Sequence, residues 1–108
     1  MKIYRAVRRA FFLVGMAGWA TLPLSVVAAD DLGNGQRLYR AQCAGCHGLN
    51  GLSVMEKAPD LARFDLLSKP DEALIEVIRS GLNEMPPYFG VLGDQDILDV
   101  VNYIRTLY

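Results

Sequence analysis

The chain has 108 residues, enough for one small domain, and its 11 basic and 12 acidic side chains nearly balance. The charge is uneven, because residues 1–29 carry four basic residues and no acidic one, which leaves residues 30–108 with a net charge of −5. This acidity argues against a nucleic-acid partner. It suits either a protein partner with a basic docking face or simple solubility.

Residues 1–29 have the pattern of a secretory signal peptide. A basic segment, residues 1–9, precedes an apolar segment, residues 10–20, and the small residues that follow end in Ala29. We expect cleavage after Ala29 and export to the periplasm, with residues 30–108 as the mature domain. An uncleaved membrane anchor is the alternative, because the apolar stretch is about long enough to span a bilayer. We therefore expect membrane contact only if the segment is retained.

The first helix of the mature domain is expected to start within residues 31–35, with Asn34 as a candidate N-cap residue, and to continue to Cys43. Gly35, Tyr39 and Cys43 recur every four residues and therefore share one face of that helix. Gly35 is either an ordinary turn glycine or a flat position at which another helix crosses closely. Tyr39 is expected to be buried.

Residues 43–47 form a C-x-x-C-H motif, with Cys43 and Cys46 followed by His47. Two thiols at this spacing can add to the two vinyl groups of one haem, and the next residue, the histidine, can then ligate the iron. The motif therefore predicts one covalently attached c-type haem. Covalent haem would also act as a staple for a mature chain of about 79 residues, which is marginal for an apolar core alone. We expect the chain to fold poorly without it.

Three other uses of the two cysteines are weighed against haem. A redox dithiol usually lies in a βαβ unit, which the sequence does not indicate. A structural zinc site needs about four protein ligands, whereas the chain has two cysteines and one histidine. A disulfide between such close residues would stabilise little, because it closes a very short loop. Haem is favoured over all three.

The middle of the chain is expected to form a loop with one short helical turn, residues 48–66, followed by a second long helix. Ser68 and Asp71 resemble a capping box for this helix, with Pro70 in its first turn. Gly81 is expected just beyond its last turn.

Residues 82–93 contain two prolines and two glycines and are expected to be irregular. The last helix is expected to begin at Asp94 or Asp96, because acidic residues suit the N-terminal end of the helix dipole. Its apolar stripe follows helical spacing: Ile97, Val100, Val101, Ile104 and Leu107. No strand is indicated, so the sequence predicts an all-α domain with three main helices.

A haem iron that is ligated by His47 has a sixth position, and two methionines of the mature chain are candidates for it. Met55 follows His47 by only eight residues, so it would reach the opposite haem face with difficulty. Met85 is 38 residues away, beyond a helix, and Pro86-Pro87 would stiffen its loop. We therefore expect Met85 to ligate the iron and Met55 to fill space. An open sixth position would instead indicate gas binding or peroxidase activity.

With these motifs in this order, residues 30–108 resemble the class I cytochromes c, in particular the small bacterial kind with a single haem. Gly35 and Tyr39 match the glycine and aromatic residue of the family's first helix, and Val100 and Tyr103 match their crossing partners on the last helix. The resemblance implies the cytochrome c fold, in which three main helices surround one covalent haem and the first and last helices cross near perpendicular.

The resemblance also implies residue roles. Pro59 resembles the proline whose carbonyl oxygen accepts a hydrogen bond from the axial histidine, here His47. Met85 matches the distal ligand. The family's tryptophan, often a propionate donor, has no counterpart, because Trp19 lies in the signal peptide. Arg63 and Tyr88 are alternative candidates for the propionates, or ordinary solvated or core residues.

The function implied is electron transfer in the periplasm by a single haem with histidine and methionine ligands, without catalysis. The expected partners are a redox donor and acceptor: a periplasmic dehydrogenase or reductase, a terminal oxidase or another cytochrome. The protein would be a free shuttle or the haem subunit of an oxidoreductase complex.

Overall fold

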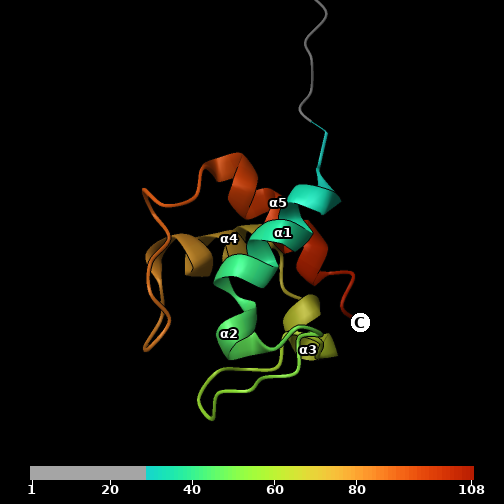
Figure 1. Cartoon of the computed structure of the whole chain (residues 1–108), viewed down its shortest axis with the longest axis vertical. Helices are drawn as coiled ribbons and strands as arrows, with labels where there is room; N and C mark the ends of the chain where they lie inside the picture. The colour runs from blue at the N-terminus through green and yellow to red at the C-terminus, as the bar shows by residue number, and fades with distance from the viewer. Residues whose placement is uncertain (1–28) are drawn as a thin grey trace, which may run out of the picture.

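The computed structural model describes residues 29–108, and within this range it contains five α-helices and no strand (Figure 1). Three are long and two are single turns: α1 (Leu32–Gln42), α2 (Ala44–His47), α3 (Phe64–Leu67), α4 (Asp71–Ser80) and α5 (Asp94–Ile104). The all-α prediction with three main helices is therefore confirmed. The signal-peptide prediction falls on residues 1–28 and the boundary residue, and so lies almost wholly outside the described part. In that part, no helix combines the length and apolarity that a membrane span requires.

Helix α1 begins at Leu32, within the predicted start region of residues 31–35. Its N-cap residue is Asp31, whose carboxylate accepts a hydrogen bond from the Asn34 backbone N–H at 2.9 Å. The expectation that Asn34 caps the helix was wrong, because the Asn34 side chain donates instead to Asp96 and Asp99 of α5. At the other end α1 stops at Gln42, so Cys43 caps the helix rather than continuing it.

Gly35 lies where α1 crosses α5 (Figure 1). A Cβ atom built on Gly35 would lie 2.1 Å from the carbonyl oxygen of Asp99 and 3.0 Å from the Cβ of Tyr103. The crossing therefore requires glycine, which confirms the flat-position interpretation. The aromatic rings of Tyr39 and Tyr103 pack beside it with centroids 5.3 Å apart, and Val100 is fully buried.

A buried carboxylate in the middle of α5 joins this helix to the N-terminal end of α1. Asp99 is only 2% exposed and accepts hydrogen bonds from the Asp31 backbone N–H, the Asn34 side chain and the Gln95 side chain, at 2.8 to 3.0 Å. Burial raises the pKa of Asp99, but the three hydrogen bonds together lower it by more than burial raises it. The pKa of Asp99 therefore lies below that of an ordinary aspartate. Ionised Asp99 thus stabilises the fold.

This low pKa predicts acid sensitivity at the α1–α5 crossing. A lowered native pKa contributes stability above the unfolded pKa of about 3.9, and that contribution is lost as the pH falls through the native pKa. Asp99→Asn should destabilise the haem protein by about 1–3 kcal/mol at pH 7, and the difference from wild type should shrink below about pH 4. Urea unfolding between pH 2 and 7 measures both. A difference that does not change with pH would contradict this account.

The start of α4 differs from the expected capping box. Pro70 is the N-cap residue and makes no side-chain cap, and the Ser68 hydroxyl donates backward to the Asp65 carbonyl oxygen at 3.0 Å. Asp71, expected to complete the box, instead accepts from the Arg105 guanidinium at 2.8 Å. The capping-box prediction was wrong because Ser68 lies two residues before the cap position.

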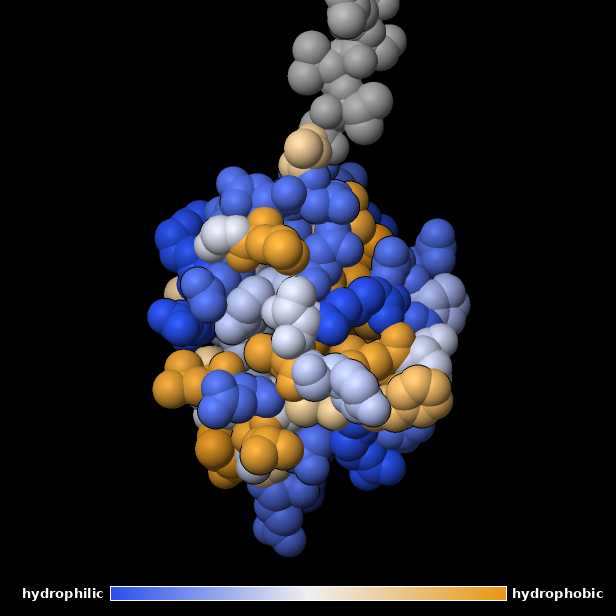
Figure 2. Space-filling view, turned by 90° about the vertical axis from the view of Figure 1, so that its right-hand side faces the viewer, coloured by the Kyte–Doolittle hydropathy of each residue, from blue (hydrophilic) through white to orange (hydrophobic). Residues whose placement is uncertain are grey.

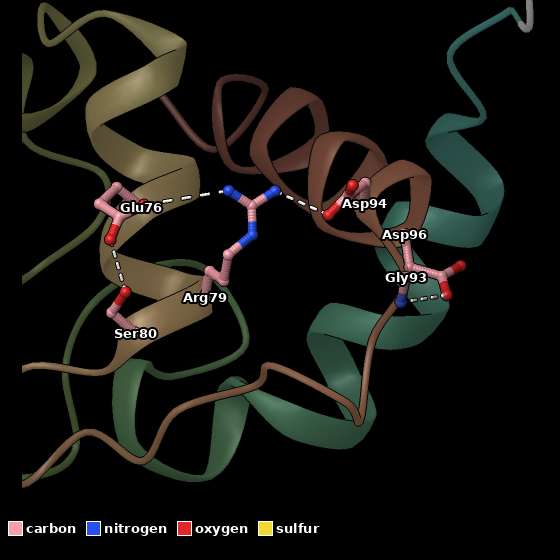
Figure 3. A network of polar contacts seen from close by, with 6 residues as sticks. All are labelled: Glu76, Arg79, Ser80, Gly93, Asp94 and Asp96. Atoms are coloured by element: carbon pink, nitrogen blue, oxygen red, sulfur yellow. Dashed lines mark hydrogen bonds and ion pairs between the residues drawn. The ribbon is translucent and has the colours of Figure 1, made fainter.

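Helix α4 ends at Gly81 as predicted, since Gly81 has a φ of +74° and its N–H donates to the Val77 carbonyl at 2.8 Å. An ion pair then links α4 to the start of α5: the Arg79 guanidinium lies 2.7 Å from an Asp94 carboxylate oxygen (Figure 3). In the same view Asp96 accepts from the Gly93 N–H at 3.2 Å. The start of α5 at Asp94 confirms the first of the two predicted positions.

The surface is mixed in character. On the face shown in Figure 2, apolar patches lie among hydrophilic residues. Several large apolar side chains are more than half exposed: Leu49, Leu52, Val54, Phe64, Leu82, Phe89 and Val91. The apolar core beneath them is centred on the α1–α5 crossing, and α4 packs against its α5 side.

Candidate functional site

The C-x-x-C-H motif forms the junction of α1 and α2. Cys43 stands between the two helices, and α2 carries Cys46 and His47 in a single turn (Figure 1). Cys43 is half-buried, Cys46 is exposed and both thiols are free. His47 is the last residue of α2 and is 8% exposed. The motif therefore presents two thiols and one buried imidazole from about one and a half turns of backbone.

The His47 ring is oriented by a carbonyl group. Its Nδ1 atom lies 2.9 Å from the carbonyl oxygen of Pro59. A carbonyl oxygen can only accept, so Nδ1 carries the proton and the Nε2 lone pair is left for a metal. Such a bond is typical of metal-bound histidines, in which it fixes the ring orientation and raises the basicity of the ligand.

The loop after the motif folds back against α2. Gly48 has a φ of +76°, and a Cβ atom there would lie 1.9 Å from the Leu52 carbonyl oxygen, so the turn requires glycine. Ser53 Oγ donates to the Cys46 carbonyl at 3.1 Å. The Tyr39 hydroxyl donates to the Gly48 carbonyl at 2.7 Å. The pKa of Tyr39 is raised to about 12, mainly because the side chain is buried. Tyr39 thereby links the core to the residue next to His47.

A cavity of about 630 Å³ opens beside the motif. Its size falls within the range of sites for small molecules and cofactors. Cys43, Cys46 and His47 lie on its wall, and Pro59 and Met85 also line it. The rest of the lining is largely apolar and comes from the α3–α4 region and α5, with Leu61, Leu66, Ala73, Leu74, Val77, Ile78, Leu82 and Ile104. The structure thus gathers all five residues that the sequence singled out.

Both methionine candidates line this cavity, on different segments. Met55 is 44% exposed and lies in the loop after α2, where its backbone N–H points to the Cys46 carbonyl at 3.3 Å. Met85 is half-buried and lies in the loop between α4 and α5. Met55 therefore lies in the same loop as Pro59, whose carbonyl orients His47, whereas Met85 comes from a separate part of the chain.

The thiol environment does not resemble that of a redox dithiol. Burial, and secondarily the neighbouring Cys46, raises the pKa of Cys43 to about 11. Reactive dithiols instead have a thiol with a lowered pKa, near a helix N-terminus or a positive charge. Among residues 29–108 no cluster of three or more His, Cys, Asp and Glu side chains is arranged to hold a metal ion.

The two candidates for the propionates lie outside the cavity wall. Arg63 pairs with Asp65 at 3.1 Å, and the Tyr88 hydroxyl donates to the Gln42 carbonyl at 2.8 Å. Two lysines that the sequence reasoning missed, Lys57 and Lys69, do line the cavity. No motif marks them, because an isolated lysine in a loop looks like any solvated residue.

Comparison with known proteins agrees with this geometry. The family model described as cytochrome c oxidase, cbb3-type, subunit III, matches residues 30–104. The chain is 33% identical over 100 residues to cytochrome c6 of Pyropia yezoensis, covering 90% of this chain and 84% of that protein. It is 34% identical over 95 residues to cytochrome c6 of Thermostichus vulcanus, covering 84% of this chain and 82% of that protein.

A solved structure gives the same answer for the fold. Cytochrome c6 from the diatom Phaeodactylum tricornutum superposes with a TM-score of 0.57 and 27% identity, covering 70% of this chain and 92% of that one. The residues present also fit a haem: two free thiols at C-x-x-C spacing, an imidazole with Nε2 available, and an apolar cavity beside them. The chain therefore belongs to the cytochrome c family, and its cofactor is haem c.

Proposed function

We propose that this protein is a periplasmic electron carrier with a single haem c and histidine–methionine ligation. The observation that carries the proposal is the cavity shared by the C-x-x-C-H motif and Met85. His47 and Met85 come from separate segments, which suits ligands on the two faces of one ring. Filling both axial positions favours electron transfer, because it leaves no open position for a substrate or a gas.

Each protein group then has a defined task. Cys43 and Cys46 tether the cofactor, His47 and Met85 ligate its iron, and the Pro59 carbonyl fixes the proton of His47 on Nδ1. Haem c supplies a reversible one-electron iron centre when bound. The apolar wall would exclude water from the cofactor, and the Met85 thioether would favour the ferrous state, so both would raise the reduction potential.

We propose the domain boundaries that the sequence pattern indicates. The family match begins at residue 30, directly after the proposed cleavage position, which supports residues 1–29 as a signal peptide and residues 30–108 as the cytochrome c domain. Export fits haem attachment of this type, which takes place outside the bacterial cytoplasm. We propose the periplasm as its location on these grounds.

The proposed partners are a redox donor and acceptor: a periplasmic dehydrogenase or reductase, a terminal oxidase or another cytochrome. The matching family model is named for an oxidase subunit, whereas the relatives are named cytochrome c6. The protein is proposed as a free shuttle or as the haem subunit of an oxidoreductase complex. The proposed role is not enzymatic.

Replacing Met85 tests the ligation. In the exported haem protein, Met85→Ala should abolish the far-red band of the sulfur–iron bond and lower the midpoint potential, within the range of about 0.8 V over which axial ligands set haem potentials. The ferrous variant should also bind carbon monoxide readily. Visible spectroscopy and redox titration measure these effects.

Met55→Ala is the matched control, because Met55 also lines the cavity. Its far-red band and potential should stay close to those of wild type. Loss of the band in Met55→Ala, with Met85→Ala unchanged, would reverse the assignment. A wild-type protein that lacks the band and binds carbon monoxide would instead favour peroxidase or gas-binding activity.

A further inference from the structure

The loop that carries Met85, residues 81–93, is held at its base mainly by backbone hydrogen bonds, with an exposed ion pair beside them. Arg79 of α4 and Asp94 of α5 form an ion pair at 2.7 Å across the two ends of the loop (Figure 3). The Phe89 N–H donates to the Arg79 carbonyl, and the Tyr88 N–H donates to the Ile78 carbonyl, both at 3.1 Å. The second half of the loop is thus hydrogen-bonded to the last turn of α4.

The Met85 segment packs closely on this base. A Cβ atom built on Gly81 would lie 2.7 Å from the Met85 carbonyl oxygen and 2.8 Å from the Pro87 nitrogen. Pro86 and Pro87 have fixed φ angles, so they form a stiff spacer of two residues between Met85 and Tyr88. The position of Tyr88 therefore constrains the position of Met85.

Tyr88 also connects this loop to the haem-attachment segment. Its hydroxyl donates to the carbonyl of Gln42, 46 residues away, at 2.8 Å. Gln42 is the last residue of α1 and directly precedes Cys43. Val91 and Leu92 N–H groups, at 3.0 Å, both donate to the Tyr88 carbonyl. Through its backbone and its side chain, Tyr88 joins α4, the second half of the loop and the end of α1.

We propose that Tyr88 is a positioning residue that keeps Met85 on the haem iron by fastening its loop to the residue before Cys43. The proposal rests on Met85 being the sixth ligand. Because Cys43 is covalently joined to haem, a bond to Gln42 fixes the loop relative to the ring itself. Without that bond, the loop should open more often, and an external ligand should replace the methionine more readily.

A second contact to the loop is weaker. Glu84 pairs with Lys57 at 2.8 Å, but the two side chains are 52% and 73% exposed. Exposed ion pairs contribute little and are screened by salt. The Tyr88 hydroxyl bond also lies at the surface, but the Tyr88 ring is half-buried against the core and the Tyr88 backbone is hydrogen-bonded to α4. Tyr88 is therefore held in place by more contacts than either partner of the ion pair.

The test is imidazole binding to the ferric, exported haem protein. Tyr88→Phe removes only the hydroxyl, and we expect imidazole affinity to rise roughly 2- to 10-fold while the far-red band is retained. Amide hydrogen exchange at Met85 and Tyr88 should accelerate as well. Tyr108→Phe is the control, because within residues 29–108 the structure gives its exposed hydroxyl no hydrogen bond, and its affinity should equal that of wild type.

The outcomes separate the two proposals. A wild-type protein without the far-red band would refute the methionine ligation and this role with it. A wild-type protein with the band, but with unchanged imidazole affinity and exchange in Tyr88→Phe, would refute the role of Tyr88 alone. A larger increase in Lys57→Gln than in Tyr88→Phe would also overturn it, in favour of the ion pair.

Discussion

A chain in which Cys43 and Cys46 are both replaced by serine should be exported without covalent haem and should not fold. The cofactor cavity measures about 630 Å³ in a domain of about 79 residues. At about 24 cal/mol per Å³, a closed and empty cavity of this volume would cost about 15 kcal/mol. That cost is comparable to the entire stability of a small domain. A pyridine haemochrome assay measures the loss of covalent haem, and far-UV circular dichroism measures the loss of helical structure.

The control for the cysteine variant is the wild-type chain produced without the haem-maturation machinery. It retains both thiols but lacks the cofactor, so it should be as poorly folded as the serine variant. If both proteins unfolded cooperatively and gave dispersed amide spectra, the packing of the helices would not depend on haem, and the stapling argument would fail.

Gly35→Ala should be the most destabilising single methyl addition in the helices of the described domain. The new Cβ would lie 2.1 Å from a backbone carbonyl oxygen of α5, which cannot rotate away as a side chain can. Helices α1 and α5 would have to separate along their crossing, which loosens the packing of Tyr39 and Val100. Overpacking of this kind costs about 3 kcal/mol when the neighbour is rigid. Guanidinium unfolding of the haem protein measures it.

Gly45→Ala is the matched control for this effect. Gly45 is also a helical glycine of the described domain, but a Cβ atom there meets nothing within 4 Å. The free energy of unfolding of the Gly45→Ala protein should stay within about 1 kcal/mol of that of wild type. Equal destabilisation by the two substitutions would mean that the close crossing does not explain the need for glycine at Gly35, because helix propensity favours alanine at both positions.

Sequence-based prediction was most accurate at positions where the backbone geometry accepts only one residue type. Gly35 on the first helix and Gly81 directly after α4 each predicted a local geometry that the structure confirms. The hydrogen bond between His47 and Pro59 was expected only from the family resemblance, because twelve residues of loop separate the two groups. Periodicity alone could not have found it.

The errors concern polar side chains with several partners available. Asn34 and Ser68 are good capping residues, yet Asn34 bonds to α5 and Ser68 bonds back to Asp65. The hydrogen-bond partner of such a side chain depends on distant residues, such as Asp99 for Asn34, whose position is set by the helix crossing. Likewise, Lys57 and Lys69 became visible as cavity residues only after the loops were placed.

The Tyr39 side chain connects the helix crossing to the haem-attachment segment, so the two parts of the domain are not structurally independent. Its ring packs against Tyr103 at the helix crossing, and its hydroxyl bonds to Gly48, the residue after the axial histidine. Loosening of the crossing is therefore transmitted directly to His47, and displacement of His47 is transmitted to the core. The colour of the protein consequently reports on the packing of its helices, and a peptide that carried the C-x-x-C-H motif without α5 would lack part of its own ligand support.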